Sequence, residues 1–186
     1  MAAYYLMAQL PTLDGLGEAA APPITEERFL ELCGRFLGKR ARRELEGLTL
    51  SPPREPARKS ASAVVNGWNR GERALRLALG AARAERLHTD FDAGDEEFPP
   101  DLLETARTAA AMDNPMEAER FLCRYRLALL ESLRPADLFC EDSVLYYGLK
   151  LKLLLRMSRF DTRAGQAAYR RIYTSILNGD RLEVLS

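Results

Sequence analysis

Residues 141–160 limit the possible folds of this chain most strongly, because apolar side chains occupy most of the circumference that they would form as a helix. A helix of this kind must be covered by other elements on nearly every side. No uninterrupted apolar run reaches the ~18 to 20 residues that a membrane span requires. We therefore expect a central helix of a helical bundle, with its apolar positions at Val144, Leu145, Tyr146, Tyr147, Leu149, Leu151, Leu153, Leu154 and Leu155.

Local start and stop signals predict helices in the rest of the chain. Thr25 followed by two glutamates indicates a capped helix start, and Asn114 before Pro115 indicates another. Residues 63–87 form a long periodic segment with Trp68 and Leu75 on its apolar side. Helix formers dominate the composition and β-branched residues are scarce. The chain is therefore expected to be an all-α bundle of about six or seven helices.

The 186 residues fit one helical domain. The proline-rich residues 49–62 are the best place for a boundary, if the domain is divided into two lobes. Residues 4–10 are compatible with a strand or with a short helix. A last helix is expected to begin at Asp161 or Thr162 and to stop at Asn178 and Gly179.

Few residues offer material for catalysis or metal binding. The chain has one histidine, His88, and three cysteines far apart in sequence, which favours structural thiols over zinc ligands. Phosphate-loop, dinucleotide and nucleophile-elbow motifs are absent. We expect no enzyme activity, no cofactor and no metal. The first residues lack a basic region typical of a signal peptide, so we expect a cytoplasmic protein.

The formal net charge is zero, but the charges are unevenly distributed. Residues 1–37 carry −3, residues 38–86 carry +7, residues 87–119 carry −9, and residues 120–186 carry +5. The acidic stretch would repel phosphates, so nucleic-acid binding is not expected. The uneven pattern fits solvated helix faces or a polarised docking surface.

Two groups of residues are candidates for binding a partner. Trp68 lies with Glu72, Arg73 and Arg76 on the long helix, and Trp and Arg are frequent at interface hot spots. A core tryptophan beside solvated arginines is the alternative interpretation, and it is the more common one. The second group comprises Lys150, Lys152 and Arg156, set into the apolar segment. These side chains either reach the surface along the helix or line a cavity for an acidic partner.

Five stretches follow one another in a particular order: YYLMAQLP, PPITEERFLELC, WNRGERALRLAL, DNPMEAERFL and SVLYYGLKLKLLLR followed by FDTRAGQ. In this order they resemble a bacterial family of unknown function that is encoded beside the genes of the V-type ATPase. The segment EAERFLCRYR, followed by the apolar helix with basic residues YYGLKLKLLLR, is the basis of a weaker similarity between that family and the C (or d) subunit of the V-type ATPase.

The resemblance implies helical modules that seat the central stalk of the ATPase on its membrane rotor ring, without bond chemistry. It assigns Arg73, Arg76, Lys150, Lys152 and Arg156 to contact with the stalk. The expected partners are stalk or ring subunits, with peripheral attachment at the inner face of the membrane. The chain is shorter than the ATPase subunit that it resembles, so a partial socket or an assembly factor fits better than a closed funnel. A general all-α adapter, unrelated to the ATPase, is the alternative function.

Overall fold

The computed structural model describes residues 2–17, 20–53, 59–92 and 98–160. This part of the chain forms seven α-helices and no strand, which confirms the predicted all-α bundle. Residues 2–9 are helical, so the first segment is a helix rather than a strand. The last predicted helix, from Asp161 or Thr162, lies outside the described residues. The helices are α1 (Ala2–Gln9), α2 (Glu26–Phe36), α3 (Lys39–Glu46), α4 (Ala63–Leu87), α5 (Pro100–Ala111), α6 (Pro115–Ser132) and α7 (Glu141–Ser158).

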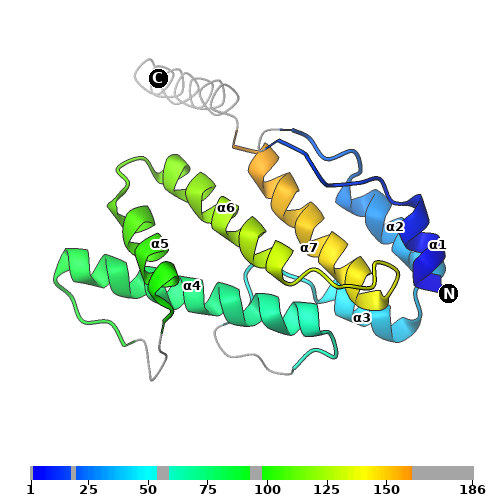
Figure 1. The fold of residues 1–186 in the computed structure, drawn as a ribbon, viewed down its shortest axis with the longest axis horizontal. Coiled ribbons are helices and arrows are strands. Elements are labelled where there is room, and N and C mark those ends of the chain that lie inside the picture. The colour runs from blue at the N-terminus through cyan, green and yellow to red at the C-terminus, as the bar shows by residue number, and fades with distance from the viewer. Residues whose placement is uncertain (1, 18–19, 54–58, 93–97, 161–186) are drawn as a thin grey trace, which may run out of the picture.

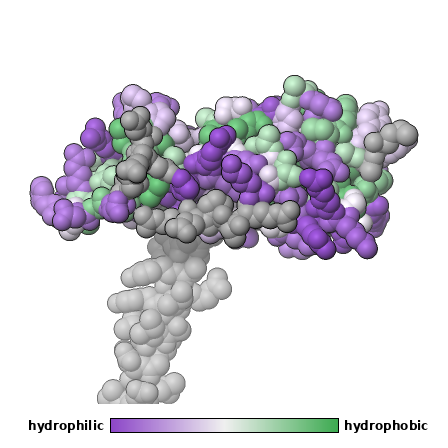
Figure 2. All heavy atoms as spheres, turned by 90° about the horizontal axis from the view of Figure 1, so that it is seen from below, coloured by the Kyte–Doolittle hydropathy of each residue, from purple (hydrophilic) through white to green (hydrophobic). Residues whose placement is uncertain are grey.

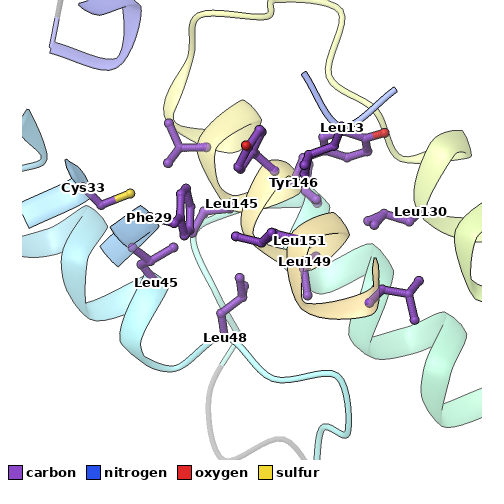
Figure 3. Packing of buried hydrophobic residues seen from close by; sticks show 14 of the residues in the cluster. Leu13, Phe29, Cys33, Leu45, Leu48, Leu130, Leu145, Tyr146, Leu149 and Leu151 are labelled. Atoms are coloured by element: carbon purple, nitrogen blue, oxygen red, sulfur yellow. The ribbon is translucent and has the colours of Figure 1, made fainter. Parts of the chain in front are cut away.

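Helix α7 is the centre of the larger part of the molecule. It contacts α1, α2, α3, α4 and α6. Twelve of its 18 residues are buried, as the apolar circumference predicts. Figure 3 shows α7 between Phe29, Cys33 and Leu45 on one side and Leu130 on the other. This helix therefore organises the packing of most of its neighbours.

The helix boundaries follow the local signals in the sequence. The Thr25 hydroxyl caps α2 by accepting a hydrogen bond from the Arg28 backbone N–H, and the Asn114 side chain caps α6. Helix α4 spans the predicted residues 63–87. It ends at His88, which adopts the left-handed conformation with φ 51° that terminates many helices. The single histidine thus terminates a helix and is exposed.

The buried residues form two clusters along the molecule. The larger cluster joins α1, α2, α3 and α7 to the first turns of α4 and to α6. The smaller cluster joins the second half of α4 to α5 and to the start of α6. Figure 1 shows α4 and α6 extending through both parts, with α5 at one end and α1 to α3 at the other.

The predicted lobe boundary at residues 49–62 is not where the core divides. Leu45 and Leu48 before this segment and Val64 and Trp68 after it belong to the same cluster. The division falls within α4, between Trp68 and Leu75. The prolines of this segment interrupt the helices, but they do not separate the clusters of buried residues. The two clusters are connected by the continuous helix α4.

Two glycines allow α4 and α6 to approach closely. A Cβ atom at Gly71 would lie 2.5 Å from Leu129 Cδ2, and one at Gly67 would lie 2.6 Å from Leu133 Cδ2. Both leucines are partly buried against the larger cluster, which restricts their movement. The contact therefore depends on the missing side chains at these two positions.

We predict that Gly71→Ala destabilises the protein although alanine is the better helix former. The higher helix propensity of alanine alone would raise the free energy of unfolding by about 1 kcal/mol. Displacement of Leu129 costs more, so the free energy of unfolding should fall by about 1 to 2 kcal/mol in total. Gly34→Ala in α2 is the control, because the nearest atom to its Cβ is an Arg42 side-chain atom at 3.7 Å. Urea unfolding should show destabilisation for the first variant and stabilisation for the second. Equal stabilisation of both would contradict a close α4–α6 contact.

Candidate partner-binding surface

Trp68 is a core residue. Its side chain is 0% exposed, and its indole Nε1 donates a hydrogen bond to the Thr49 carbonyl oxygen at 3.2 Å. This hydrogen bond connects Thr49, in the segment after α3, to α4. A partner cannot reach the ring in this structure, so the core interpretation of Trp68 fits and the partner-binding one does not.

Arg73 and Arg76 lie on the outer side of α4. Arg76 is exposed and donates a hydrogen bond to the Pro52 carbonyl oxygen at 2.7 Å. Arg73 is partly buried and lines a groove of about 380 Å³ on this side of the helix, together with Lys59 and Arg70. Figure 2 shows many hydrophilic residues on this face of the molecule. These two arginines therefore remain near the surface, in a basic setting.

Lys150 is buried inside the molecule and held by two carboxylates. Its Nζ lies 2.5 Å from Asp14 and 2.5 Å from Glu131. Arg134 is 3.1 Å from the same Asp14 and 3.6 Å from Glu131. Two cations and two carboxylates thus form a neutral cluster that joins the loop after α1 to α6 and α7. Lys150 does line a cavity, as one interpretation of the sequence expected, but its charge is already neutralised.

These contacts shift the ionisation of the cluster. The hydrogen bond from Lys150, with a further one from Arg134, lowers the pKa of the Asp14 carboxyl. Burial tends to raise the pKa of Glu131, but the Lys150 hydrogen bond and charge outweigh it and the net pKa is lowered. Burial tends to lower the pKa of Lys150, and its two carboxylate partners raise it overall. The cluster is therefore fully charged near neutral pH.

Lys152 and Arg156 are also paired within the chain. Lys152 Nζ lies 2.5 Å from Glu26 Oε1, and an Arg156 guanidinium nitrogen lies 2.6 Å from Glu119 Oε1. Both side chains are partly exposed. The structure does not bring the six predicted binding residues together at one site: Trp68, Arg73 and Arg76 occupy α4, and the other three occupy α7.

A buried ion pair between α4 and α6 has no counterpart among the predictions from sequence. Arg126 Nε lies 2.8 Å from one Glu72 oxygen, and a terminal guanidinium nitrogen lies 3.0 Å from the other. The exposed fractions are 1% for Glu72 and 8% for Arg126. Arg126 also contacts Glu119, which is shared with Arg156 on α7. One network therefore connects three helices through four charged residues.

The most deeply buried stripe of α6 contains a charged residue. Helical periodicity predicts an inner face of α6 made of Phe121, Leu122, Tyr125, Leu129 and Leu133. Leu122 is buried, and the other four side chains are partly buried and pack against the two clusters. The buried residues are Leu122, Cys123, Arg126 and Leu130. Arg126 follows Leu122 and precedes Leu130 by four residues, so its place on the buried stripe was detectable. The predicted inner face and the most deeply buried stripe are therefore adjacent and share Leu122.

We predict strong coupling between Glu72 and Arg126. Glu72→Leu leaves Arg126 buried with only part of its partners, and Arg126→Leu isolates Glu72, so each should lower the free energy of unfolding by about 3 to 5 kcal/mol. The double variant should be more stable than either single variant, because it leaves no unpaired charge in the buried site. Glu119 retains its ion pair with Arg156 in this variant. A double-mutant cycle by urea unfolding measures this coupling.

The exposed pair of Glu85 and Arg107, 3.4 Å apart between α4 and α5, is the control for this cycle. Its coupling should stay below about 1 kcal/mol. Similar coupling energies in the two cycles would show that burial of the Glu72 pair has no special role.

Exposed aromatic and aliphatic side chains gather at one end of the molecule, and no pattern in the sequence singles them out. Tyr4 and Tyr5 of α1 are 51% and 56% exposed, and Leu138 and Phe139 of the α6–α7 loop are 47% and 45% exposed. The Tyr4 ring centroid lies 4.7 Å from that of Phe139 and 5.6 Å from that of Tyr5. Figure 1 shows this loop beside α1. We call these four residues the aromatic patch.

The thiols of the two buried cysteines are unreactive. Burial raises the pKa of Cys33 to about 12, and burial followed by the Glu119 charge raises the pKa of Cys123. Both therefore remain protonated near neutral pH. Cys140 is partly exposed and lies at the N-cap position of α7.

Neither a metal centre nor a membrane span is found in the described part of the chain. Among these residues, no group of three or more His, Cys, Asp and Glu side chains is arranged to hold a metal ion. None of the helices in the described ranges has the length and apolarity needed to cross a bilayer. No known protein family, curated protein or solved structure matches the chain.

The lowered pKa values predict a loss of stability in acid. Asp14 and Glu131 have ordinary pKa values of 3.8 and 4.5, and folding lowers both. Their contribution is therefore complete above the unfolded pKa values and is lost as pH falls through the lower folded ones, so stability should decrease below about pH 5. Asp14→Asn with Glu131→Gln should make urea-unfolding stability depend less on pH in this range. An unchanged slope would show that the cluster around Lys150 does not contribute.

Proposed function

We propose that this protein is a non-catalytic subunit or accessory factor of a V-type ATPase, and that it binds its partner through the aromatic patch. Exposure of four large apolar side chains at one place carries the binding part of the proposal. Contiguous exposed apolar residues mark interaction sites more often than scattered ones do. Tyrosine and phenylalanine are also enriched in interface cores.

The internal pairing of the other candidates supports this choice of surface. Lys150, Lys152 and Arg156 each have a carboxylate partner within 2.6 Å, so binding an acidic stalk through them would require existing ion pairs to break. The four patch residues need no such rearrangement. Arg73 and Arg76, which the resemblance assigns to the stalk, lie on α4 and would form a separate contact.

The ATPase part of the proposal rests on the resemblance in sequence. The all-α architecture with a central helix carrying basic residues is compatible with it. The expected partners are subunits of the central stalk or of the membrane ring, with the protein attached peripherally at the inner face of the membrane. The function would be mechanical or assembly-related, with binding as its only chemistry.

We predict that the purified protein co-elutes with co-expressed stalk or ring subunits at low and moderate salt. Tyr4→Ser with Phe139→Ser should weaken that association about tenfold or more, because both rings lose their contact area. Size-exclusion chromatography and titration calorimetry measure the two effects. Circular dichroism verifies that the variant remains folded.

Leu87→Ser is the matched control, because Leu87 is 71% exposed at the far end of α4. This variant should bind like the wild type. Separate elution of the wild-type protein from all the ATPase subunits would refute the ATPase proposal and favour the general adapter. Undiminished binding by the patch variant would place the interface elsewhere.

A further inference from the structure

Four basic side chains lie close together on the short helix α3. All four are exposed, and in the described part of the chain none of them belongs to an ion pair. The basic residues Lys150, Lys152 and Arg156 of α7 differ, because each has a carboxylate partner. We call the four residues of α3 the basic face: Lys39, Arg40, Arg42 and Arg43.

The packing of α3 keeps these side chains at the surface. Ala41 and Leu45 lie one turn apart, are buried in the larger cluster and form the side of α3 that faces the core. Successive residues are about 100° apart around a helix, so the basic residues spread over nearly half of its circumference. The Arg42 guanidinium extends toward α2, 3.7 Å from the position of a Cβ atom at Gly34. The basic face is therefore broad and convex.

The carboxylates near α3 do not neutralise the basic face. Glu44 accepts hydrogen bonds from the segment before α4. Glu46 is exposed at the last position of α3 and offsets at most one of the four positive charges. On α2, Glu31 already pairs with two arginines of its own helix. An excess of positive charge therefore remains at this surface.

The stability of α3 does not explain the arrangement of its charges. Lys39 lies three positions before Arg42 and four before Arg43, so like charges are neighbours along the helix. Arg40 also lies three positions before Arg43. Positive charges in a first turn interact unfavourably with the helix dipole as well. These residues therefore cost the helix stability, and a negatively charged partner would offset that cost.

The shape and chemistry of the basic face select an extended anionic surface as its partner. No apolar side chain of α3 is exposed, whereas the core of a protein–protein interface is usually apolar and depleted of charged residues. Side chains that diverge around a helix cannot converge on one small anion. A membrane leaflet with anionic headgroups, in contrast, attracts clusters of basic residues without any apolar contact.

The distribution of charge along the molecule would orient it on such a surface. The chain as a whole has no net charge, so attraction to a membrane requires a local excess of positive charge. Helix α3 lies at one end of the molecule and α5 at the other (Figure 1), and residues 87–119, which include α5, carry −9. An anionic surface would therefore attract the first end and repel the second.

We propose that the basic face of α3 binds the headgroups of an anionic phospholipid membrane. Its four side chains contact the phosphates of several lipids at once. Nothing enters the hydrocarbon layer, because Ala41 and Leu45 stay in the protein core. The choice of a lipid surface over other polyanions rests on the peripheral membrane attachment that is part of the proposed function.

Co-sedimentation of the full-length protein with vesicles tests this contact. At low salt the wild type should bind vesicles of phosphatidylcholine mixed with phosphatidylglycerol, and it should not bind vesicles of phosphatidylcholine alone. Raising the salt should weaken the binding, because exposed charges are screened. Arg40→Gln with Arg43→Gln should weaken it about tenfold or more, since each basic residue near an anionic membrane contributes about fivefold.

Two further variants serve as controls. Arg40→Lys with Arg43→Lys keeps the charge and should bind within about twofold of the wild type. Arg83→Gln with Arg86→Gln removes two exposed arginines at the far end of α4 and should also leave binding unchanged. Equal weakening by the two glutamine variants would overturn the proposal, because only the net charge would then matter.

Thermal unfolding without lipid verifies that the variant of the basic face is folded. Arg40→Gln with Arg43→Gln should unfold at the same temperature as the wild type or about 1 to 3 °C higher at low salt, because like-charge neighbours are removed. Vesicles that contain phosphatidylglycerol should raise the midpoint of the wild type more than that of this variant. An equal rise for both proteins would contradict a contact through α3.

The outcomes separate this inference from the proposed function, because the vesicle experiment contains no ATPase subunit. Vesicle binding through the basic face without co-elution of ATPase subunits would support the lipid contact and refute the ATPase proposal. Co-elution without binding to anionic vesicles would overturn the lipid contact and keep the ATPase proposal. Binding to duplex DNA or to polyglutamate, but not to vesicles, would identify a different polyanion and also overturn the lipid contact.

Discussion

The bidentate contact between Glu72 and Arg126 fixes how the long helices are arranged. Both side chains are buried at the junction of the two apolar clusters, where an unpaired charge would be strongly unfavourable. Helices α4 and α6 can therefore pack only in the register that brings these groups together. Glu119 extends the constraint to α7 through Arg156. Apolar contacts alone would allow α4 and α6 to slide or rotate against each other more readily than this ion pair does.

The same internal pairing determines what the surface can offer. The basic side chains Lys150, Lys152 and Arg156 of α7 are neutralised by carboxylates from the loop after α1, from α2 and from α6, so the central helix presents little free charge. The exposed apolar residues gather elsewhere, at the junction of α1 with the α6–α7 loop. A binding role at this junction needs no change in the core. The network of Glu72, Arg126, Glu119 and Arg156 therefore shares no residue with the aromatic patch, whereas the cluster around Lys150 adjoins it.

Much of the fold could be predicted from local patterns. The caps at Thr25 and Asn114, the extent of α4 and the burial of α7 all depend on residues within a few positions of one another. The burial of Arg126 in α6 and the division of the core could not be obtained in this way. Both depend on partners far away in sequence, such as the 54 residues that separate Glu72 from Arg126. A local pattern does not show that a charged residue such as Arg126 will have a buried partner on another helix.

Local sequence was enough to establish that the chain is helical, where most of its described helices begin and end, and which helix must lie at the centre. These properties follow from backbone capping and from the need to cover an apolar circumference. The choice of which charged side chains are buried and which apolar ones are exposed came from the folded arrangement instead. Trp68 and Lys150 are candidates for contact with a partner and lie inside, whereas Tyr4 and Phe139 lie outside. Burial depends on neighbours that long-range packing brings together, and residue type alone does not specify those neighbours.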